Sequence, residues 1–419
     1  MSTPPSSRPP LFMLIAGEIS GDALAAELVQ ALRDTPVVRA GPFAPRFFGA
    51  GGPRMSEAGV ELALDLTRHS VVGFSEVLRH YRKFRRFLHE LMQLALARQP
   101  DVIIGVDFSG FNRRLLHALR HHLDRHRRLF ENWRPRLVQY VSPQVWASRP
   151  GRASGLARDL DLLLCLFPFE QAWYRRHAPK LHVEFVGHPL VDRHADIQPG
   201  VDSGSPAGIA TGSAGSSGGK ILLLPGSRAS EIRRHLPVML RAVQELAATD
   251  AVQVGTQAPH SPLRFTVVFP DASLRAQAQT MCARMVPGLE LRTGGLAEAL
   301  AQATVAIAST GTVTLECAWF RVPTVALYKT SWPTYLIARQ MVSVPHLAMP
   351  NLLAGEELFP EFIQHRANPK NLAGAVRKLL ADVEHRREVR TRLSQLQQQL
   401  GPPGAAARAA AAVARLLVD

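Results

Sequence analysis

The sequence predicts an α/β protein made of two doubly wound, Rossmann-like domains that face each other across a central cleft. Twice in the chain, an apolar strand runs into a short loop rich in Gly and Ser that opens a helix, at residues 11–22 and again at 221–231. A stretch rich in Gly, Ser, Ala and Thr, residues 200–219, lies between the two halves. At 419 residues, the chain is also too long for one ordinary hydrophobic core and suits two domains.

The first domain is expected to span residues 1–199, where apolar runs alternate with helical patterns. Residues 11–16 predict a buried strand, and residues 23–33 predict a helix because apolar side chains recur at helical spacing. Further buried strands are expected at 46–49, 101–106, 137–141, 160–166 and 183–186. Strands that alternate with helices favour a parallel, doubly wound sheet.

The second domain is expected to span residues 220–419 and to repeat this scheme, with residues 200–219 as a flexible linker. Its strands are expected at 221–224, 264–269, 289–292, 305–308 and 324–328. Residues from Pro369 onward predict helices, and the Ala-rich residues 404–418 predict a terminal helix that folds back.

The composition is that of a globular protein with an excess of positive charge. Hydrophobic residues make up 46% of the chain and charged residues 20%, and the formal net charge is +15. Such a surface favours anionic partners. Cys165, Cys282 and Cys317 lie in apolar sequence without close pairing, which predicts reduced, buried thiols in a cytosolic protein. Residues 1–10 are polar and rich in Pro, and the sequence has no apolar run of 18 residues, so neither a cleaved signal peptide nor a spanning helix is expected.

Two loops in the second half have the composition of phosphate-binding loops. In residues 224–228 a strand stops at Pro225 and Gly226, and Ser227 and Arg228 follow; an Arg offers a bidentate, permanently charged fork to a diphosphate. In residues 308–316 a strand enters a loop of small and hydroxyl residues that opens a helix. Backbone amides at such a helix start bind phosphate, and Glu316, one turn in, can accept the ribose hydroxyls. The alternative for both loops is an ordinary structural turn.

In the first half, Asp107 ends an apolar strand at the expected carboxyl edge of the sheet. A carboxylate there can accept a proton during catalysis, although Asp is equally common as a helix N-cap. Glu18, Ser20 and Asp22 raise the same two alternatives. Neither His-Glu-x-x-His nor Cys-x-x-Cys spacing occurs, so no zinc site is predicted, and His188 before Pro189 is expected to be structural rather than a base.

Residues 71–99 predict a helix with one apolar and one basic face. Val77, Tyr81, Phe84, Leu88 and Leu91 recur at helical spacing and are expected to face the core. The alternatives for the basic face are a solvated helix surface or a membrane-surface face, with Val71, Val72 and Phe74 dipping into lipid. The residues that would face the membrane are Val71, Val72, Phe74, Arg82, Lys83, Arg85 and Arg86.

Taken together, these segments resemble the lipid-A-disaccharide synthase family, over residues 11–364 and apart from the linker. The resemblance rests on motifs in a fixed order: Ala16 to Asp22, Gly51 to Met55, Tyr140 to Ala147, Leu166 to Glu170, Val186 to Pro189, Leu224 to Arg228, Gly311 to Glu316 and Pro350 to Gly355. The chain departs from the usual motifs at Ser109, Gly110, Ser148 and Glu356.

The resemblance implies a GT-B fold with an N-terminal acceptor and membrane-facing domain, a C-terminal UDP-sugar domain, and neither bound metal nor cofactor. It implies that Asp107 is the general base. It implies a nucleotide-sugar site at Ser227, Arg228, Gly311, Thr312, Glu316 and Asn351. On the acceptor side it implies the loop residues Gly17, Glu18, Ser20, Gly21, Asp22, Gln144 and Trp146. It further implies a homodimer in which Asn351 serves the neighbouring protomer's site.

The function that this resemblance implies is an inverting glycosyl transfer in lipid A biosynthesis. The enzyme would move 2,3-diacylglucosamine from its UDP donor to 2,3-diacylglucosamine 1-phosphate, forming a β-1,6 disaccharide 1-phosphate and UDP. It would be cytoplasmic and bound peripherally to the inner face of the cytoplasmic membrane, without a nucleic-acid partner. The alternatives are a UDP-sugar epimerase or hydrolase on the same fold, a nucleic-acid-binding protein suggested by the charge, and a catalytically inactive scaffold.

Limited proteolysis is expected to cut first between Gly200 and Gly219, because a Gly- and Ser-rich segment lacks contacts that resist local opening. A denaturing gel should then show two stable fragments, each about half of the chain. Initial cleavage inside either half, with this stretch resistant, would refute the division into two domains.

Overall fold

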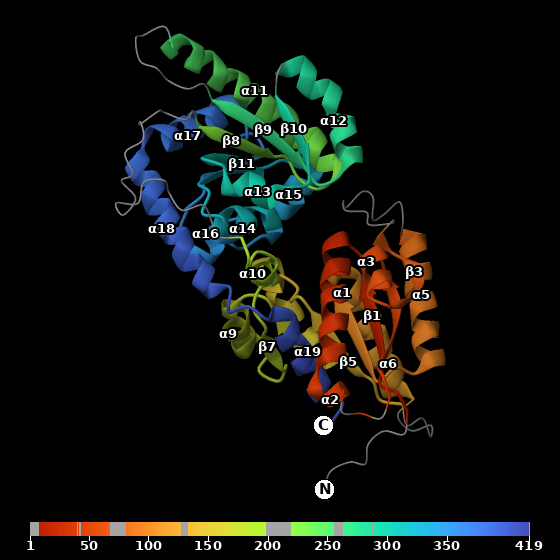
Figure 1. Cartoon of the computed structure of the whole chain (residues 1–419). Coiled ribbons are helices and arrows are strands. Elements are labelled where there is room, and N and C mark those ends of the chain that lie inside the picture. The colour runs from red at the N-terminus through yellow and green to blue at the C-terminus, as the bar shows by residue number, and fades with distance from the viewer. Residues whose placement is uncertain are drawn as a thin grey trace. The chain divides into compact units, whose positions relative to one another are not determined.

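The computed structural model describes residues 8–39, 41, 43–67, 81–126, 133–197, 219–254, 263–286 and 289–418. The chain forms two compact units (Figure 1). The first unit combines Met1–Arg193 with Leu400–Asp419, and the second is His194–Gln399.

Within the described residues, the first unit holds a seven-stranded parallel sheet in the order β3-β2-β1-β4-β5-β6-β7. Its strands are β1 Leu11–Ala16, β2 Arg46–Gly51, β3 Glu61–Asp65, β4 Val102–Val106, β5 Arg136–Tyr140, β6 Leu162–Cys165 and β7 Val183–Phe185. All the strands expected in this half are confirmed. The sequence did not predict β3, a short strand at the edge of the sheet.

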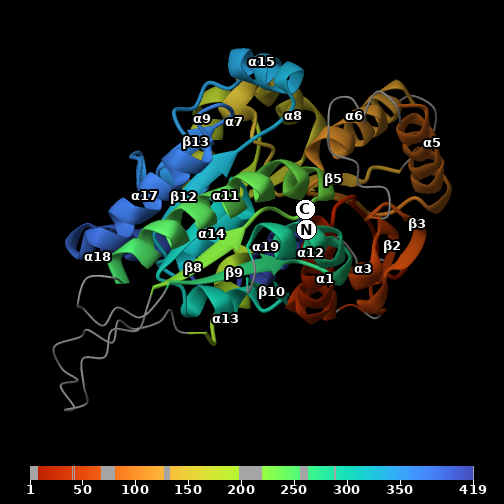
Figure 2. The ribbon, with the colours of Figure 1, turned by 90° about the horizontal axis from the view of Figure 1, so that it is seen from above.

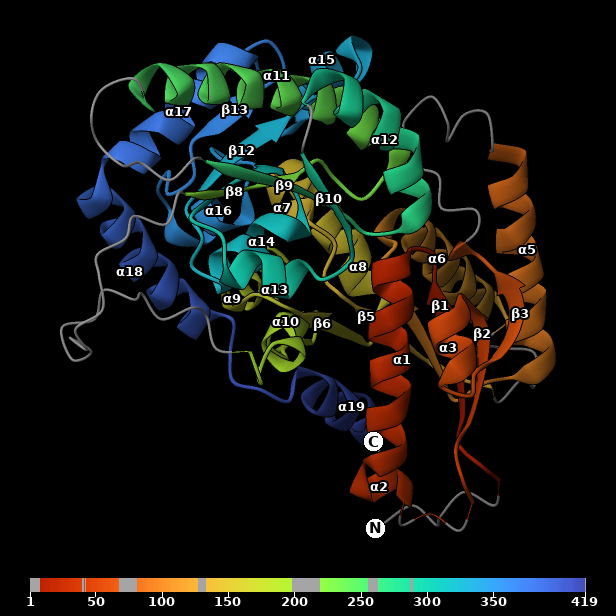
Figure 3. The same ribbon diagram turned by 45° about the horizontal axis from the view of Figure 1, so that its top comes forward.

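Helices cover both faces of this first sheet. They are α1 Ile19–Asp34, α2 Pro36–Arg39, α3 Pro53–Glu57, α5 Tyr81–Arg98, α6 Ser109–Arg125, α7 Val145–Ser148, α8 Ala153–Asp159, α9 Pro168–His177 and α10 Pro189–Arg193, with a 3-10 turn at Pro150–Arg152. Met13 and Ile15 of β1 share one hydrophobic cluster with α5, α6, α8 and α9. Helices α1 and α5 lie on opposite sides of the sheet (Figure 3).

The last helix of the chain, α19 (Ala405–Arg415), belongs to the first unit and packs against α1 (Figure 3). The carboxylate of Asp192 accepts hydrogen bonds from the amides of Gly404 and Ala405, the latter at 2.9 Å. Arg408 donates to the carbonyl of Val186 at 2.8 Å. The terminal helix was predicted. The predicted domain of residues 220–419 differs from the second unit of the structure, because residues 400 onward pack on the first unit.

Among its described residues, the second unit holds a six-stranded parallel sheet in the order β10-β9-β8-β11-β12-β13. Its strands are β8 Lys220–Leu224, β9 Arg264–Phe269, β10 Glu290–Thr293, β11 Val305–Ser309, β12 Thr324–Tyr328 and β13 Glu361–Ile363. Its helices are α11 Ala229–Val254, α12 Ala272–Met285, α13 Leu296–Ala301, α14 Thr312–Trp319, α15 Trp332–Met341, α16 Met349–Ala354, α17 Pro369–Ala381 and α18 Val383–Gln399. The five expected strands are confirmed, and the short edge strand β13 was not predicted.

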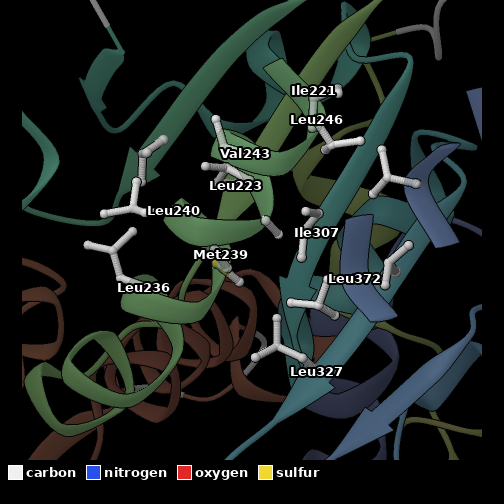
Figure 4. Close-up of a cluster of buried hydrophobic side chains, with 14 of the residues drawn as sticks. Ile221, Leu223, Leu236, Met239, Leu240, Val243, Leu246, Ile307, Leu327 and Leu372 are labelled. Carbon is white, nitrogen blue, oxygen red and sulfur yellow. The ribbon is translucent and has the colours of Figure 1, made fainter. Parts of the chain in front are cut away.

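Alternate residues of β8 point into two different cores. Ile221 and Leu223 pack with α11, α12 and α17 on one face of the sheet (Figure 4). Leu222 and Leu224 pack with α13, α14 and α18 on the other. Figure 2 shows β8, β9 and β12 running beneath α11 and α17. Burial on both faces explains why this strand is apolar throughout.

In both sheets the strand order reverses next to the first strand, between β1 and β4 and between β8 and β11. Ligands of open parallel sheets bind at the carboxyl ends of the strands at such switch points. Asp107 follows β4, and Arg228 and Gly311 follow β8 and β11, so these three candidate residues lie at the two switch points.

The three cysteines are buried, as expected, and burial raises the pKa of the Cys282 thiol to about 11. Among the helices that the structure describes, none combines the length and apolarity that crossing a bilayer requires.

Candidate active site

Strand β4 of the first unit ends in a left-handed turn that carries Asp107. Asp107 has φ 49° and Phe108 has φ 39°, a conformation that costs energy for residues other than Gly. The ring of Phe108 lies against Gly17, where a Cβ would overlap it. A strained turn of this kind at the end of a parallel strand is typical of functional sites.

Two buried amide side chains hold this turn. The Nδ2 of Asn112, on α6, and the Nε2 of Gln139, on β5, each donate to the carbonyl oxygen of Asp107 at 3.0 Å. The amide of Asp107 donates to the carbonyl of Tyr140 at 2.8 Å. The backbone of Asp107 is therefore held by the interior of the sheet. Sequence reasoning missed both amides as contributors to the site.

The predicted loop 17–22 lies beside Asp107. The Ser20 hydroxyl is 3.4 Å from Oδ2 of Asp107, and a Cβ at Gly21 would lie 3.3 Å from the Asp107 Cβ. Ser20 is exposed and Glu18 and Asp107 are half-buried, whereas Gly17 and Gly21 are buried. The structure therefore brings the two predicted segments together.

Asp22 has a structural role instead. Its side chain is buried, and its carboxylate accepts hydrogen bonds from the amides of Gly52, Arg54 and Met55 at 2.8, 3.0 and 3.1 Å. It therefore satisfies the free amides at the start of α3, in the manner of an N-cap. This contact joins the motif that contains Asp22 to the motif at residues 51–55.

Trp146 is buried as well, in a cluster that joins two further motifs of the sequence. Its indole nitrogen donates to Oε1 of Glu170 at 3.0 Å, and the amide of Phe167 donates to Oε2 at 3.1 Å. Burial raises the pKa of the Glu170 carboxyl from its ordinary range to about 7. Gln144 and Trp146 were both predicted to lie on the acceptor side. Gln144 is exposed at the start of α7, whereas Trp146 is buried and packs inside the first unit.

His188 lies next to this cluster and is structural, as expected. Its ring packs 5.4 Å from the ring of Phe167, and its Nδ1 accepts a hydrogen bond from the amide of Leu190 at 3.1 Å. Burial lowers the pKa of its imidazole to about 3, so the ring is neutral.

The predicted basic helix is α5, and its first turns lie close to the Asp107 turn. Phe84 is 6.2 Å from Phe108, centroid to centroid, and Leu91 is buried, so the predicted core face is confirmed where it is described. The four basic side chains predicted to face the membrane are exposed: Arg82, Lys83, Arg85 and Arg86. Val71, Val72, Phe74 and Val77 lie outside the described residues.

In the second unit, the loop after β8 is organised by Glu231 of α11. Its carboxylate accepts from the Ser227 amide at 3.0 Å and from the Arg228 guanidinium at 3.1 Å. Gly226 has φ 124°, and the Glu231 side chain occupies the space of a Cβ there, so only Gly fits. The side chain of Arg228 is 40% exposed and can still reach a ligand. Sequence reasoning missed Glu231.

The neighbouring loop after β11 leaves its backbone open to solvent. Gly311 and Thr312 are exposed, and nothing lies within 4 Å of where a Cβ of Gly311 would be. Helix α14 begins at Thr312, and Glu316 is half-buried one turn further on. Since β8 and β11 are hydrogen-bonded neighbours, the two loops lie at the same edge of the sheet. A helix start with open amides beside an Arg side chain can bind a diphosphate.

Asn351, in contrast, does not present its side chain to this edge. The residue is fully buried, and its Nδ2 donates to the Phe359 carbonyl and to Glu361, each at 2.8 Å. Its Oδ1 accepts from the Phe359 amide at 2.8 Å. These bonds use both hydrogens of the side-chain amide, so Asn351 fixes α16 to β13 and does not offer a donor to a nucleotide.

The part of the chain that the structure describes contains no group of three or more His, Cys, Asp or Glu side chains arranged to hold a metal ion.

Two Rossmann-like sheets in one chain define the GT-B class of glycosyltransferase fold, and solved structures agree. The UDP-GlcNAc 2-epimerase of Neisseria meningitidis, bound to UDP-GlcNAc, superposes with a TM-score of 0.55 at 10% identity, over 97% of this chain and 99% of that chain. The glycotransferase of kitacinnamycin superposes with a TM-score of 0.56 at 17% identity, over 98% of this chain and 99% of that chain. These likenesses show the fold alone.

The chain belongs to the lipid-A-disaccharide synthetase family, which matches residues 12–415. Lipid-A-disaccharide synthase of Alkalilimnicola ehrlichii is 37% identical over 96% of this chain and 97% of its own length. The same enzyme of Syntrophus aciditrophicus is 33% identical over 96% of both. The chain is therefore a glycosyltransferase of lipid A biosynthesis, which confirms the resemblance. The alternatives of an epimerase and of a nucleic-acid-binding protein are not favoured.

The raised pKa of Glu170 predicts a pH-dependent contribution to stability. Because the folded protein binds this proton more tightly than the unfolded chain, the contribution is full below the ordinary carboxyl pKa and is lost as pH rises through about 7. From pH 5 to pH 8, the free energy of unfolding of the wild type should fall by about 2 to 3 kcal/mol relative to that of Glu170→Gln.

Urea unfolding of both proteins at each pH measures this difference. Glu57→Gln, at an exposed position on α3, is the matched control and should track the wild type at every pH. A constant difference between wild type and Glu170→Gln would contradict the titration of a buried carboxyl here.

Proposed function

We propose that this chain transfers 2,3-diacylglucosamine from UDP to the 6-hydroxyl of 2,3-diacylglucosamine 1-phosphate. The products would be the β-1,6 disaccharide 1-phosphate and UDP. The observation that carries the proposal is the Asp107 carboxylate, held at the switch point of the first sheet in a chain of this family. A fixed carboxylate at that position suits the general base of a direct displacement.

In the proposed reaction, the 6-hydroxyl oxygen of the acceptor attacks the anomeric carbon of the donor as its bond to the UDP oxygen breaks. Asp107 accepts the hydroxyl proton, and UDP leaves with the bonding electron pair. Attack from the side opposite UDP converts an α-linked donor into a β-linked product. Ser20, whose hydroxyl is 3.4 Å from Asp107, would orient the carboxylate.

The second unit would bind the UDP part of the donor and stabilise the charge that develops on it. Arg228 and the hydroxyl of Ser227 would contact the diphosphate from the loop after β8. The exposed backbone at Gly311 and Thr312 would contact it from the loop after β11. Glu316 would accept hydrogen bonds from the ribose. Preorganised donors of this kind act where charge appears in the transition state.

We further propose that the protein binds peripherally to the inner face of the cytoplasmic membrane, where its acylated substrates lie, and that it forms a homodimer as the family resemblance implies. The exposed cations of α5 support membrane binding, because Phe84 places this helix beside the Asp107 turn. Val71, Val72 and Phe74 would supply the apolar contact with lipid. Asn351 is buried, so its side chain would not serve a neighbouring protomer's site.

Asp107→Asn is expected to lower turnover by at least about 10², because the change removes the proton acceptor and little volume. UDP affinity should not change, since Asp107 lies in the first unit and the nucleotide loops in the second. Radiolabelled UDP-diacylglucosamine with its monosaccharide phosphate acceptor measures turnover. Asp124→Asn, at an exposed position on α6, is the control. Turnover near that of the wild type would refute Asp107 as the base.

Arg228→Ala and Glu316→Gln are each expected to weaken UDP binding, since one removes a diphosphate contact and the other a ribose acceptor. A charge-assisted hydrogen bond contributes roughly 1.5 to 3 kcal/mol, or about 10- to 150-fold in affinity. Calorimetric titration with UDP measures the loss, and Arg275→Ala, exposed on α12, should bind UDP like the wild type. Unchanged affinity in both variants would move the nucleotide site elsewhere.

Replacing Arg82, Lys83, Arg85 and Arg86 with Gln is expected to release the protein from anionic vesicles at physiological salt. Each basic side chain near an anionic surface contributes roughly 1 kcal/mol, and salt screens it. Val72→Asp should weaken vesicle binding even at low salt, because it removes the apolar contact. Arg175 and Arg176, exposed on α9, serve as the matched pair for a control Gln variant. If both test variants sediment with anionic vesicles as the wild type does, α5 does not contact the membrane.

A further inference from the structure

Helix α15 of the second unit has no buried residue, although half of its side chains are large and apolar. Trp332 is 58% exposed, Leu336 56% and Ile337 43%. Of the eight large apolar side chains that are exposed among the described residues, these three lie on this one helix. An apolar helix face of this kind marks a surface that contacts a further apolar partner.

The exposed side chains follow the helix period. Trp332 and Leu336 are one turn apart, and so are Pro333 and Ile337, so the first two turns of α15 form one apolar patch. Arg339 and Gln340 follow on the third turn and are exposed too. The chain contains no Asp or Glu from Cys317 to Gly355. The patch therefore carries positive charge at its border and no negative charge from its own segment.

A basic pocket of about 300 Å³ adjoins the start of α15, at the carboxyl ends of β12 and β13. It is lined by Arg234, Lys329, Thr330, Ser331, Trp332, Gln364 and His365. Lys329 is held in place, because its Nζ donates to the carbonyls of Gln364 and Ala367 at 3.0 and 3.1 Å. Arg234 and His365 are exposed. No carboxylate lines the pocket, so its charge suits an anion.

We propose that α15 and this pocket form a membrane-docking surface of the second unit, with an anionic phospholipid bilayer as the occupant. Trp332, Leu336 and Ile337 enter the interfacial layer of the bilayer, and Arg234, Lys329 and Arg339 contact lipid phosphates. An apolar helix face bordered by cations is the arrangement of interfacial helices, and Trp favours that depth of the bilayer. The absence of acidic residues from this segment matches anionic lipid rather than the basic surface of a second copy, since the chain carries a net charge of +15.

This inference rests on the proposed function in one respect. In the proposed function, the second unit binds an acylated donor that has to leave the lipid phase. A lipid contact on the second unit would bring this unit to the membrane that holds the donor. The surface is distinct from the basic helix α5, which belongs to the first unit. Each of the two units would then carry its own contact with the membrane.

The first test compares binding to vesicles of phosphatidylcholine with about one third phosphatidylglycerol. The double variant Leu336→Ser, Ile337→Ser is expected to raise the apparent Kd at least about tenfold, because two exposed apolar side chains lose their burial in lipid. Val383→Ser, at a 49% exposed position on α18, is the matched control and should bind like the wild type. Thermal melts check that the double variant folds. Unchanged vesicle affinity in a folded double variant would overturn the proposal.

The second test places Trp332 in the bilayer directly. Vesicles with brominated acyl chains quench a Trp side chain only where it enters the lipid, and Trp332 is the one exposed Trp among the described residues. The wild type is expected to be quenched, and Trp332→Phe is expected to lose that part of the signal. Equal quenching of the wild type and Trp332→Phe would show that α15 stays out of the bilayer and would overturn the proposal.

The third test concerns charge. Arg234→Gln and Arg339→Gln are each expected to weaken binding to anionic vesicles about fivefold at low salt and to have little effect on neutral vesicles. Arg275→Gln, exposed on α12, is the control. Equal losses on neutral and anionic vesicles would contradict contact with lipid phosphate.

Two readouts separate this surface from the proposed reaction and from a dimer interface. In detergent micelles, where the substrates need no bilayer, the Leu336→Ser, Ile337→Ser variant is expected to keep wild-type UDP affinity and turnover. Vesicle binding tests the surface even if the wild type transfers a different sugar. Sedimentation velocity is expected to show the same oligomeric state for this variant and the wild type. A dimer that dissociates in the variant, with vesicle binding intact, would assign α15 to subunit contact and overturn the proposal.

Discussion

The left-handed turn at the end of β4 is the constraint on which the candidate active site depends. Two successive non-Gly residues in this region cost of the order of 1 to 3 kcal/mol each, and they persist only where the surrounding structure compensates. Here Asn112 and Gln139 supply the compensation, because both are buried and both donate to the Asp107 carbonyl. Gly17 leaves room for the Phe108 ring, because a Cβ at this position would overlap it. A carboxylate carried by a backbone that is fixed in this way starts close to one position, which favours general-base catalysis.

Most of the fold could be predicted because the strands of both sheets are buried on two faces. Such strands are apolar at every position, as in residues 102–106 and 221–224, and they stand out from the helices between them. The strands that sequence reasoning missed, β3 and β13, lie at sheet edges and contain charged residues. The return of α19 to the first unit could not be predicted either, because it depends on contacts such as Asp192 with Ala405 between segments far apart in the chain.

The sequence could predict which loops form the candidate site. It could not predict which residues of these loops face a ligand and which support the fold. Loops at the ends of β1, β4, β8 and β11 were identified, since their Gly, Ser and Asp residues interrupt apolar strands. Asp22, Trp146 and Asn351 belong to equally distinctive motifs, yet each is buried and hydrogen-bonded within the protein. A residue that supports a loop and a residue that touches a ligand leave the same signal in one sequence. Only the direction of the side chain separates them.

A buried histidine that belongs to neither of the two proposed surfaces of the second unit connects them. His235 is fully buried, and burial lowers the pKa of its imidazole, so the ring is neutral. The amide of Lys329 donates to Nε2 at 3.1 Å, so the proton is on Nδ1 and is donated to the Pro225 carbonyl at 2.8 Å. Pro225 begins the loop that carries Arg228, and Lys329 lines the pocket beside α15. One neutral imidazole thus fixes the loop after β8 and the segment just before α15 to each other, so a shift at either is resisted by the same pair of buried hydrogen bonds.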